Sequence, residues 1–271
     1  MPVGVTAFEC MSHIDEFDAW AGFVGHSPAT RKRRRSTLRR FRRDNPVWPT
    51  EPKAEKRLIE RWLSRFDDPQ TRRSYLGDIR AFFTWAVEED LIAYNPAQGI
   101  RAPRVAQRRP NPLLRSEVVA AFGACQDLQD RLAVSLGVYA GLRVSEMAHL
   151  VHADVDLVGR VLMVRQGKGR KDRAVPVCDD LAVLLERRDE LDAGTGYNVS
   201  QRIKRTFKRA GVTGHRPHDL RATFATMLIR EGIDLVTVQS YLGHASVATT
   251  QRYVLPNDAG VALVNRLSFA A

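Results

Sequence analysis

The sequence has few cysteines and no long apolar run. Its 271 residues include only Cys10, Cys125 and Cys178, which lie far apart. This spacing excludes a disulfide scaffold and a cysteine-rich zinc module, and it fits a reducing compartment. The longest nearly apolar stretch, 133–142, is shorter than the about 20 residues that a membrane-spanning helix needs. Because the N-terminus lacks a basic stretch followed by an apolar one, we expect no signal peptide and a cytoplasmic protein.

Acidic residues are outnumbered by basic ones. The chain carries 42 Lys and Arg against 31 Asp and Glu, which gives a net charge of +11. Because 44% of the residues are hydrophobic and 27% are charged, the composition is that of a folded protein. A folded protein this basic most often binds a polyanion, usually nucleic acid. Composition alone leaves a ribosomal protein or another basic soluble protein open.

A basic stretch with several prolines divides the chain. Residues 101–115 (RAPRVAQRRPNPLLR) hold three prolines and five arginines, and proline disfavours helix at its own and the preceding position. We therefore predict an N-terminal domain over 1–102, an extended linker over 103–115 and a second domain over 116–271. In the first domain, Ser-Pro at 27–28 and Asp-Pro at 68–69 are typical helix starts, and no strand is expected before residue 105.

The second domain is predicted to mix helices with a small sheet. Short apolar segments at 161–164 and 174–177 flank a turn with two glycines, which favours a β-hairpin. Helices are predicted over 116–125, 128–139, 144–150, 179–190, 199–210, 218–231, 234–242 and 246–253. The expected fold class is mainly α with one small β-sheet (α+β).

Four short segments of this domain hold side chains suited to chemistry. They are AGLRVSE with Arg143, the hairpin GKGRKDRAVP with Lys168, HDLR with His218 and Arg221, and LGH with His244 followed nine residues later by Tyr253. Each segment alone has an ordinary structural explanation, such as a helix cap, a solvated turn or a core tyrosine.

Together these motifs resemble those of the tyrosine recombinases, also called the phage integrase family. Their order and spacing match the family from about residue 115 to 255. The N-terminal part resembles the family's helical core-binding domain more loosely. The resemblance implies a helical core-binding domain followed by a mixed catalytic domain.

The resemblance also implies how DNA would be cut. Tyr253 matches the nucleophile that attacks a DNA phosphate and forms a 3′-phosphotyrosine link. Arg143 and Arg221 match the family's two arginines that hold this phosphate, and His244 would donate a further hydrogen bond. Fixed cationic donors suit this role because charge accumulates on the five-coordinate phosphorus.

The resemblance also implies which residues of the motifs transfer protons. A free tyrosine has a pKa near 10, so it needs a base, for which His218 is the candidate. Lys168 resembles the general acid that protonates the departing 5′-oxygen, and Glu146 would orient Arg143. The scheme needs neither a metal nor another cofactor. The histidine pairs 149/152 and 215/218 lack a third ligand at a recognisable spacing, so no metal site is expected.

The basic run at 31–43 has two explanations within this resemblance. It holds nine basic residues in thirteen and no acidic one, while Leu38 and Phe41 would pack inward. One explanation is a solvated helix face; the favoured one is contact with DNA phosphates. The predicted DNA-contacting residues, including linker and hairpin positions, are Arg31, Lys32, Arg34, Arg35, Arg39, Arg42, Arg108, Arg109 and Arg170.

The resemblance leaves several family members open. Residues 1–26 lack the strands and basic residues of an arm-binding domain. We favour a compact phage or mobile-element integrase, because the composition is rich in Arg and Ala and the spacing from Arg143 to His218 is short. A Xer-type recombinase that resolves chromosome dimers is the alternative. A type IB topoisomerase-like enzyme and a catalytically silent DNA-binding protein are more remote.

The expected partners are double-stranded DNA and further copies of the chain. We expect a monomer in solution that assembles as a homotetramer on two DNA sites, with no membrane contact. The segment after Tyr253 has a short apolar face that would dock on a neighbouring copy, and packing within the same copy is the alternative. This face consists of Val261, Leu263, Val264 and Leu267.

Overall fold

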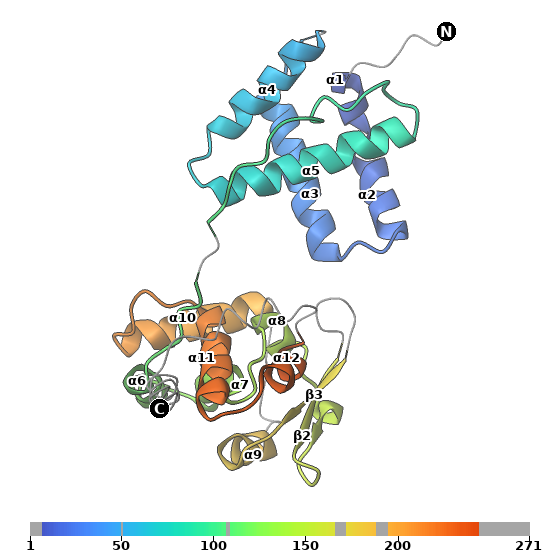
Figure 1. The fold of residues 1–271 in the computed structure, drawn as a ribbon. Helices are drawn as coiled ribbons and strands as arrows, with labels where there is room; N and C mark the ends of the chain where they lie inside the picture. The colour runs from blue at the N-terminus through green and yellow to red at the C-terminus, as the bar shows by residue number, and fades with distance from the viewer. Residues whose placement is uncertain (1–6, 50, 107–108, 166–171, 188–194, 244–271) are drawn as a thin grey trace, which may run out of the picture. The chain divides into compact units, whose positions relative to one another are not determined.

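The chain folds as two compact units, Met1–Gln107 and Arg108–Ala271 (Figure 1). This computed structural model describes residues 7–49, 51–106, 109–165, 172–187 and 195–243. Each unit has its own hydrophobic core. The predicted fold class, mainly helical with one small sheet, is confirmed. Within the described ranges, no helix has the length and apolar character needed to cross a membrane.

All the regular secondary structure that is described in unit 1 is helical, as predicted. Its elements are α1 (Ala7–Cys10), the 3₁₀ helix η1 (Met11–His13), α2 (Ile14–Phe23), α3 (Pro28–Asp44), α4 (Pro52–Ser64) and α5 (Pro69–Glu88). Aromatic rings fill its core. Phe17, Phe41, Trp62 and Phe82 are almost fully buried, and Phe41 meets Trp62 edge to face with ring centres 4.9 Å apart. Leu38 is fully buried beside Phe41 on α3, as the sequence predicted.

The two helix starts predicted in unit 1 are confirmed. Ser27 caps α3, since its hydroxyl accepts a hydrogen bond from the Thr30 N–H at 3.3 Å. The carboxylate of Asp68 caps α5 by accepting the N–H groups of Gln70 and Thr71. In both helices proline occupies the first turn, where its missing N–H costs nothing. These local signals suffice to set where α3 and α5 begin.

The centre of unit 2 is a buried helix, α7, which packs against α9, α10 and α11 (Figure 1). Its elements are α6 (Arg115–Gly123), α7 (Leu128–Tyr139), α8 (Val144–Met147), η2 (His152–Asp154), β1 (Val155–Asp156), β2 (Val161–Val164), β3 (Arg173–Pro176), α9 (Asp179–Glu186), α10 (Gly196–Arg209), α11 (Pro217–Arg230) and α12 (Leu235–Leu242). Most of α7 is buried, so this helix forms the centre of the aliphatic core.

Several bounds in unit 2 differ from the sequence prediction, among them the end of α9, at Glu186 instead of 190, and the start of α10, at Gly196 instead of 199. The helix predicted over 144–150 ends at Met147, because the chain then turns into η2, where Asp154 accepts the Val151 N–H at 3.1 Å. The two-residue strand β1 was not predicted, since so short a strand has no pattern of its own. Strand β3 begins one residue earlier than expected, at Arg173. The helix predicted over 246–253 lies outside the described residues.

The sheet is antiparallel in the order β1-β2-β3, and the predicted pairing of 161–164 with the following strand is confirmed. In β2 and β3, Leu162 pairs with Val175 and Val164 pairs with Arg173. Side chains alternate between the two faces of a strand, so Arg173 points to the same buried side as Val175. An arginine is therefore placed among the core residues of the sheet.

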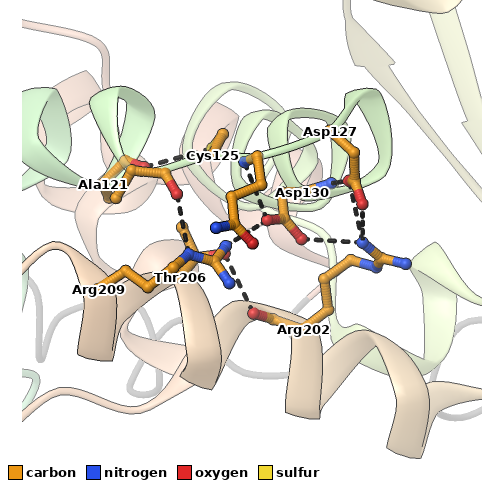
Figure 2. Close-up of polar contacts among 9 residues, drawn as sticks. Ala121, Cys125, Asp127, Asp130, Arg202, Thr206 and Arg209 are labelled. Atoms are coloured by element: carbon orange, nitrogen blue, oxygen red, sulfur yellow. Dashed lines mark hydrogen bonds and ion pairs between the residues drawn. The ribbon is translucent and has the colours of Figure 1, made fainter.

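A polar cluster ties α10 to the start of α7 (Figure 2). The Asp130 carboxylate is almost fully buried, and it accepts hydrogen bonds from the Arg202 and Arg209 guanidinium groups. Arg202 also donates to Asp127 at 2.8 Å, and Arg209 donates through Nε to the Ala124 carbonyl at 3.0 Å. Because a buried carboxylate is stable only when its hydrogen bonds are satisfied, this cluster fixes the position of α10.

The turn after α7 requires glycine at one position. Gly141 has φ +62°, the left-handed region that glycine adopts without steric cost. A Cβ atom there would lie 2.4 Å from Cδ1 of Phe224 on α11. This turn brings the chain back from α7 to Arg143, which directly precedes α8.

We predict that Gly141→Ala destabilises the protein by about 2–4 kcal/mol, since it adds both left-handed strain and a clash. Gly77→Ala is the matched control, because Gly77 lies inside α5 and a Cβ there meets nothing within 4 Å. The control should stabilise by about 0.5–1 kcal/mol. Urea unfolding measures both. Equal effects of the two substitutions would contradict this account of the turn.

Candidate active site

Three segments that are distant in the sequence meet at the Glu146 side chain: 143–146, strand β3 and helix α11. Glu146 lies on α8, and its carboxylate accepts the backbone N–H of Arg143 at 2.7 Å and its Nη1 at 2.6 Å. The first bond caps the N-terminus of α8. The second holds the Arg143 guanidinium, whose side chain is 21% exposed. Glu146 therefore orients Arg143 in this structure.

A second arginine, Arg173 of β3, binds the same carboxylate through two bonds. Its Nη1 and Nη2 donate to Oε1 and Oε2 of Glu146 at 2.9 and 2.7 Å. Its Nε donates to the Tyr241 carbonyl of α12 at 2.6 Å. Both side chains of this pair are only 6% exposed. The paired geometry matches the planar fork of an arginine to the two oxygens of a carboxylate.

The third arginine, Arg221 of α11, is fully buried. Its Nη1 donates to the Gly141 carbonyl at 2.6 Å, and its Nη2 donates to the Leu242 carbonyl. Its Nη1 lies 3.7 Å from Oε2 of Glu146. The structure thus brings Arg143 and Arg221, both predicted from the motifs, to one carboxylate.

We call Arg143, Glu146, Arg173 and Arg221 the arginine cluster. Three positive charges less one negative charge leave it a net charge of +2. Burial alone would raise the pKa of the Glu146 carboxyl, but the hydrogen bonds and charges of Arg173 and Arg143 prevail and lower it to about 2. The carboxylate therefore stays ionised, and the cluster remains cationic and suited to bind an anion.

His218 lies in the first turn of α11, on the same helix as Arg221. The pKa of His218 is lowered from its ordinary value, first by loss of hydration around the ring and then by the positive charges of Arg221 and Arg143. The ring is therefore neutral at pH 7, the form in which an imidazole accepts a proton.

The remaining catalytic predictions lie outside the described residues. These are Lys168, His244 and Tyr253. The predicted DNA-contacting residues Arg108 and Arg170 also lie outside them. The described part of the site is therefore the arginine cluster with His218.

In unit 1, most of the predicted DNA-contacting arginines have acidic partners. Arg31 and Arg35 of α3 both bind Asp18 of α2, at 2.7 and 3.1 Å. Arg39 binds Asp15 at 2.7 Å. These contacts tie the basic face of α3 to α2, an arrangement that the composition of 31–43 did not reveal.

Other members of the basic run differ in their surroundings. Arg34 contacts Nδ1 of His26 at 2.9 Å and lies 3.7 Å from Asp78. Arg42 donates to the Met11 carbonyl at 3.3 Å. Lys32 and the linker residue Arg109 are exposed.

Sequence reasoning gave Arg173 no role, although the residue lies in the hairpin motif. One signal was present: Arg173 has the same parity along the strand as Val175 and Val177, which are buried. A charged residue in register with core positions needs a buried partner, and that partner is Glu146.

We predict that Glu146→Gln destabilises the protein by about 3–5 kcal/mol at pH 7, because buried Arg173 loses its counter-charge. The carboxylate contributes stability above its ordinary pKa of 4.5, and this contribution is lost as the pH falls through about 2. The difference in free energy of unfolding between wild type and variant, measured in urea, should therefore become smaller as the pH falls from 4.5 to about 2. The exposed Glu60→Gln is the control and should cost little. A gap independent of pH would contradict the assignment.

Comparisons with known proteins give the family. The family model described as Phage integrase family matches residues 113–259. The tyrosine recombinase XerA of Thermococcus kodakarensis is 33% identical over 263 residues, 89% of this chain and 89% of its own. A tyrosine recombinase of Thermosipho africanus is 33% identical over 196 residues, 66% of this chain and 69% of its own.

Solved structures share the fold. The crystal structure of XerA recombinase matches 97% of this chain and 100% of its own, with a TM-score of 0.52 and 26% identity. A lambda integrase dimer bound to a COC′ core site matches 89% of this chain and 94% of its own, with a TM-score of 0.71 and 21% identity. The chain belongs to the phage integrase family of tyrosine recombinases and is a site-specific DNA recombinase.

Proposed function

We propose that the protein is an integrase that cuts and rejoins double-stranded DNA through a covalent tyrosine intermediate. The observation that carries this proposal is the arginine cluster, a net cationic group that shares helix α11 with His218. A phosphodiester is an anion that gains charge on the way to a five-coordinate phosphorus. Donors fixed before the reaction stabilise that charge without having to reorganise.

Arg143 would make the first contact with the scissile phosphate. It is the most exposed arginine of the cluster, and one of its Nη atoms is already held by Glu146 at 2.6 Å. Its other guanidinium N–H groups can donate to the nonbridging oxygens. Arg221 is buried beneath, so we expect it to stabilise the phosphate by its charge and by holding the Gly141 carbonyl of the turn before Arg143.

The proposed reaction exchanges one phosphoester for another. The Tyr253 oxygen forms a bond to phosphorus while the bond from phosphorus to the 5′-oxygen breaks. The phenol proton passes to neutral His218, and Lys168 gives a proton to the departing 5′-oxygen. His244 would donate a hydrogen bond to the phosphate. A 5′-hydroxyl of a second DNA strand then attacks the phosphotyrosine, and the reaction needs no external energy source.

The choice between an integrase and a Xer-type enzyme depends on different observations. The short spacing from Arg143 to His218 supports an integrase of a phage or mobile element. Relatives named XerA and XerC, at 33% and 34% identity, favour the second candidate, a recombinase for chromosome dimer resolution. The DNA site that the protein cuts separates the two, because an attachment site and a dimer-resolution site lie in different genomic settings.

We also propose that the protein acts as a homotetramer on paired DNA sites and is a monomer when free. A lambda integrase that shares the fold is described as a dimer on a core site, which supports assembly on DNA. Two exposed residues, Lys32 of unit 1 and Arg109 at the start of unit 2, would contact the DNA backbone directly. The arginines paired with Asp15 and Asp18 would exchange these partners for phosphates on binding.

We predict that the protein forms an SDS-resistant adduct with nicked DNA from its own genomic neighbourhood, and that Tyr253→Phe abolishes the adduct. The phenylalanine variant keeps the ring but lacks the attacking oxygen. Sequencing of the trapped DNA then identifies the site and separates an integrase from a Xer-type enzyme. An adduct that persists in the variant would mean that another residue is the nucleophile. Salt-sensitive binding without any adduct would favour a silent DNA-binding protein.

We predict that deletion of residues 256–271 leaves binding to a single DNA site intact but weakens complexes of several copies. The removed segment includes the apolar face that we expect to dock on a neighbouring copy. Gel shifts with one-site and two-site DNA measure the two states. Unchanged assembly on two-site DNA would contradict docking between copies.

A further inference from the structure

We propose that Arg173 is a positioning residue for strand cleavage. It would hold Glu146, and through Glu146 the guanidinium of Arg143, in the orientation that the scissile phosphate requires. This inference rests on the proposed phosphate-binding role of Arg143. It gives a function to the one arginine of the cluster that neither the motif analysis nor the proposed mechanism uses.

The contacts of Arg173 place it behind the reacting groups. Each of its three guanidinium nitrogens donates to a protein acceptor: Nη1 and Nη2 to Glu146, and Nε to the Tyr241 carbonyl. The residue is 8% exposed, whereas the Arg143 side chain is 21% exposed. Arg173 therefore acts on a phosphate only through its neighbours.

Arg173 orients Arg143 through the carboxylate of Glu146, which both residues bind. The Arg173 fork uses both carboxylate oxygens at 2.9 and 2.7 Å, which fixes the plane of the carboxylate. Arg143 binds the same two oxygens, with Nη1 on Oε1 at 2.6 Å and its backbone N–H on Oε2 at 2.7 Å. If the carboxylate rotated, both bonds to Arg143 would be lost. Small misplacements of this kind are costly in catalysis.

Arg173 also holds the C-terminal end of α12. The last carbonyls of a helix lack partners within it, and here two consecutive ones are bound by the cluster. Arg173 binds the Tyr241 carbonyl, and Arg221 binds the Leu242 carbonyl. Gly243 then ends the helix with φ +61°, and a Cβ there would lie 3.0 Å from Cδ of Arg173. One side chain thus fixes β3, α8 and the end of α12 together.

A lysine at position 173 could not make the contacts that Arg173 makes with Glu146 and Tyr241. Its single ammonium group carries the same charge but cannot span two carboxylate oxygens in one plane and a carbonyl on a third side. Arg173→Lys therefore keeps the charge of the cluster while it releases the orientation of Glu146. This substitution separates positioning from simple neutralisation of charge.

The cluster around Asp130 supplies a matched control (Figure 2). Arg209 donates through Nε to a backbone carbonyl and through Nη2 to the buried Asp130 carboxylate, as Arg173 does with Tyr241 and Glu146. Its bonds to Ala124, Asp130 and Thr206 involve no member of the arginine cluster. Arg209→Lys thus disturbs a comparable arginine–carboxylate contact of the same unit outside the candidate site.

The experiment measures covalent adduct formation on two DNA substrates. One carries the natural phosphodiester at the scissile position, and the other carries a methylphosphonate, in which a methyl group replaces a nonbridging oxygen and removes the charge. Arg173→Lys should slow adduct formation on the phosphodiester by on the order of 100-fold, with unchanged single-site binding. On the neutral methylphosphonate, Arg173→Lys should slow adduct formation much less, since cleavage of that substrate depends less on an aligned Arg143. Arg209→Lys should cleave both substrates like the wild type.

Two results would overturn the inference. One is an Arg173→Lys protein that cleaves the phosphodiester at the wild-type rate. The other is an equal loss on both substrates, which is the result of a structural defect alone. Should Arg173→Lys fail to fold, Glu146→Asp serves as the second variant, because it keeps the charge but shortens the reach to Arg143. It should show the same dependence on substrate charge, and a uniform loss would overturn the inference.

Failure of the proposed function gives a different result. If Arg143→Ala retains full adduct formation, Arg143 does not hold the phosphate, whatever the outcome for Arg173. If Arg143→Ala is defective while Arg173→Lys is not, the proposed function stands and only the positioning role is wrong.

Discussion

The arrangement of the candidate site depends on one buried carboxylate. Three guanidinium groups gathered this closely would repel one another, and Glu146 offsets that repulsion by binding two of them and lying near the third. Because the carboxyl pKa is lowered to about 2, its charge is present at every physiological pH. The same side chain caps α8 through the Arg143 N–H. One carboxylate therefore both caps a helix and holds the cationic site together.

Many of the positive charges in unit 1 are already paired with carboxylates of the same unit. The sequence carries a net +11, and the run at 31–43 alone holds nine basic residues. In the folded unit 1, Asp15 and Asp18 bind three of the arginines on α3. Arg33 and Arg34 lie near Asp78, which is almost fully buried, and this burial raises the pKa of Asp78 despite their positive charges. The basic face is thus partly neutralised within the unit, and under the proposed function DNA phosphates would compete with these carboxylates.

Helix caps explain which elements could be predicted from the sequence, and contacts with distant residues explain which could not. Helices α3 and α5 begin where Ser27 and Asp68 can cap them, and such caps are visible in a few adjacent residues. Helix α8 is shorter than predicted because Asp154 stabilises the next turn through the Val151 N–H. Strand β1 exists only through its pairing with β2. Elements that depend on a distant partner carry little signal of their own.

The sequence by itself determined the fold class, the main helices, the hairpin pairing and the family, because caps, periodicity and motif spacing are properties of neighbouring residues. It also singled out Arg143, Arg221 and Glu146. Only the tertiary structure decided that these residues share one carboxylate with Arg173, and that Arg221 is buried while Arg143 reaches the surface. The physical reason is distance along the chain. Glu146 and Arg173 are separated by 27 positions, and the packing of β3 against α12, of α12 against α11 and of α11 against α7 brings such charges together.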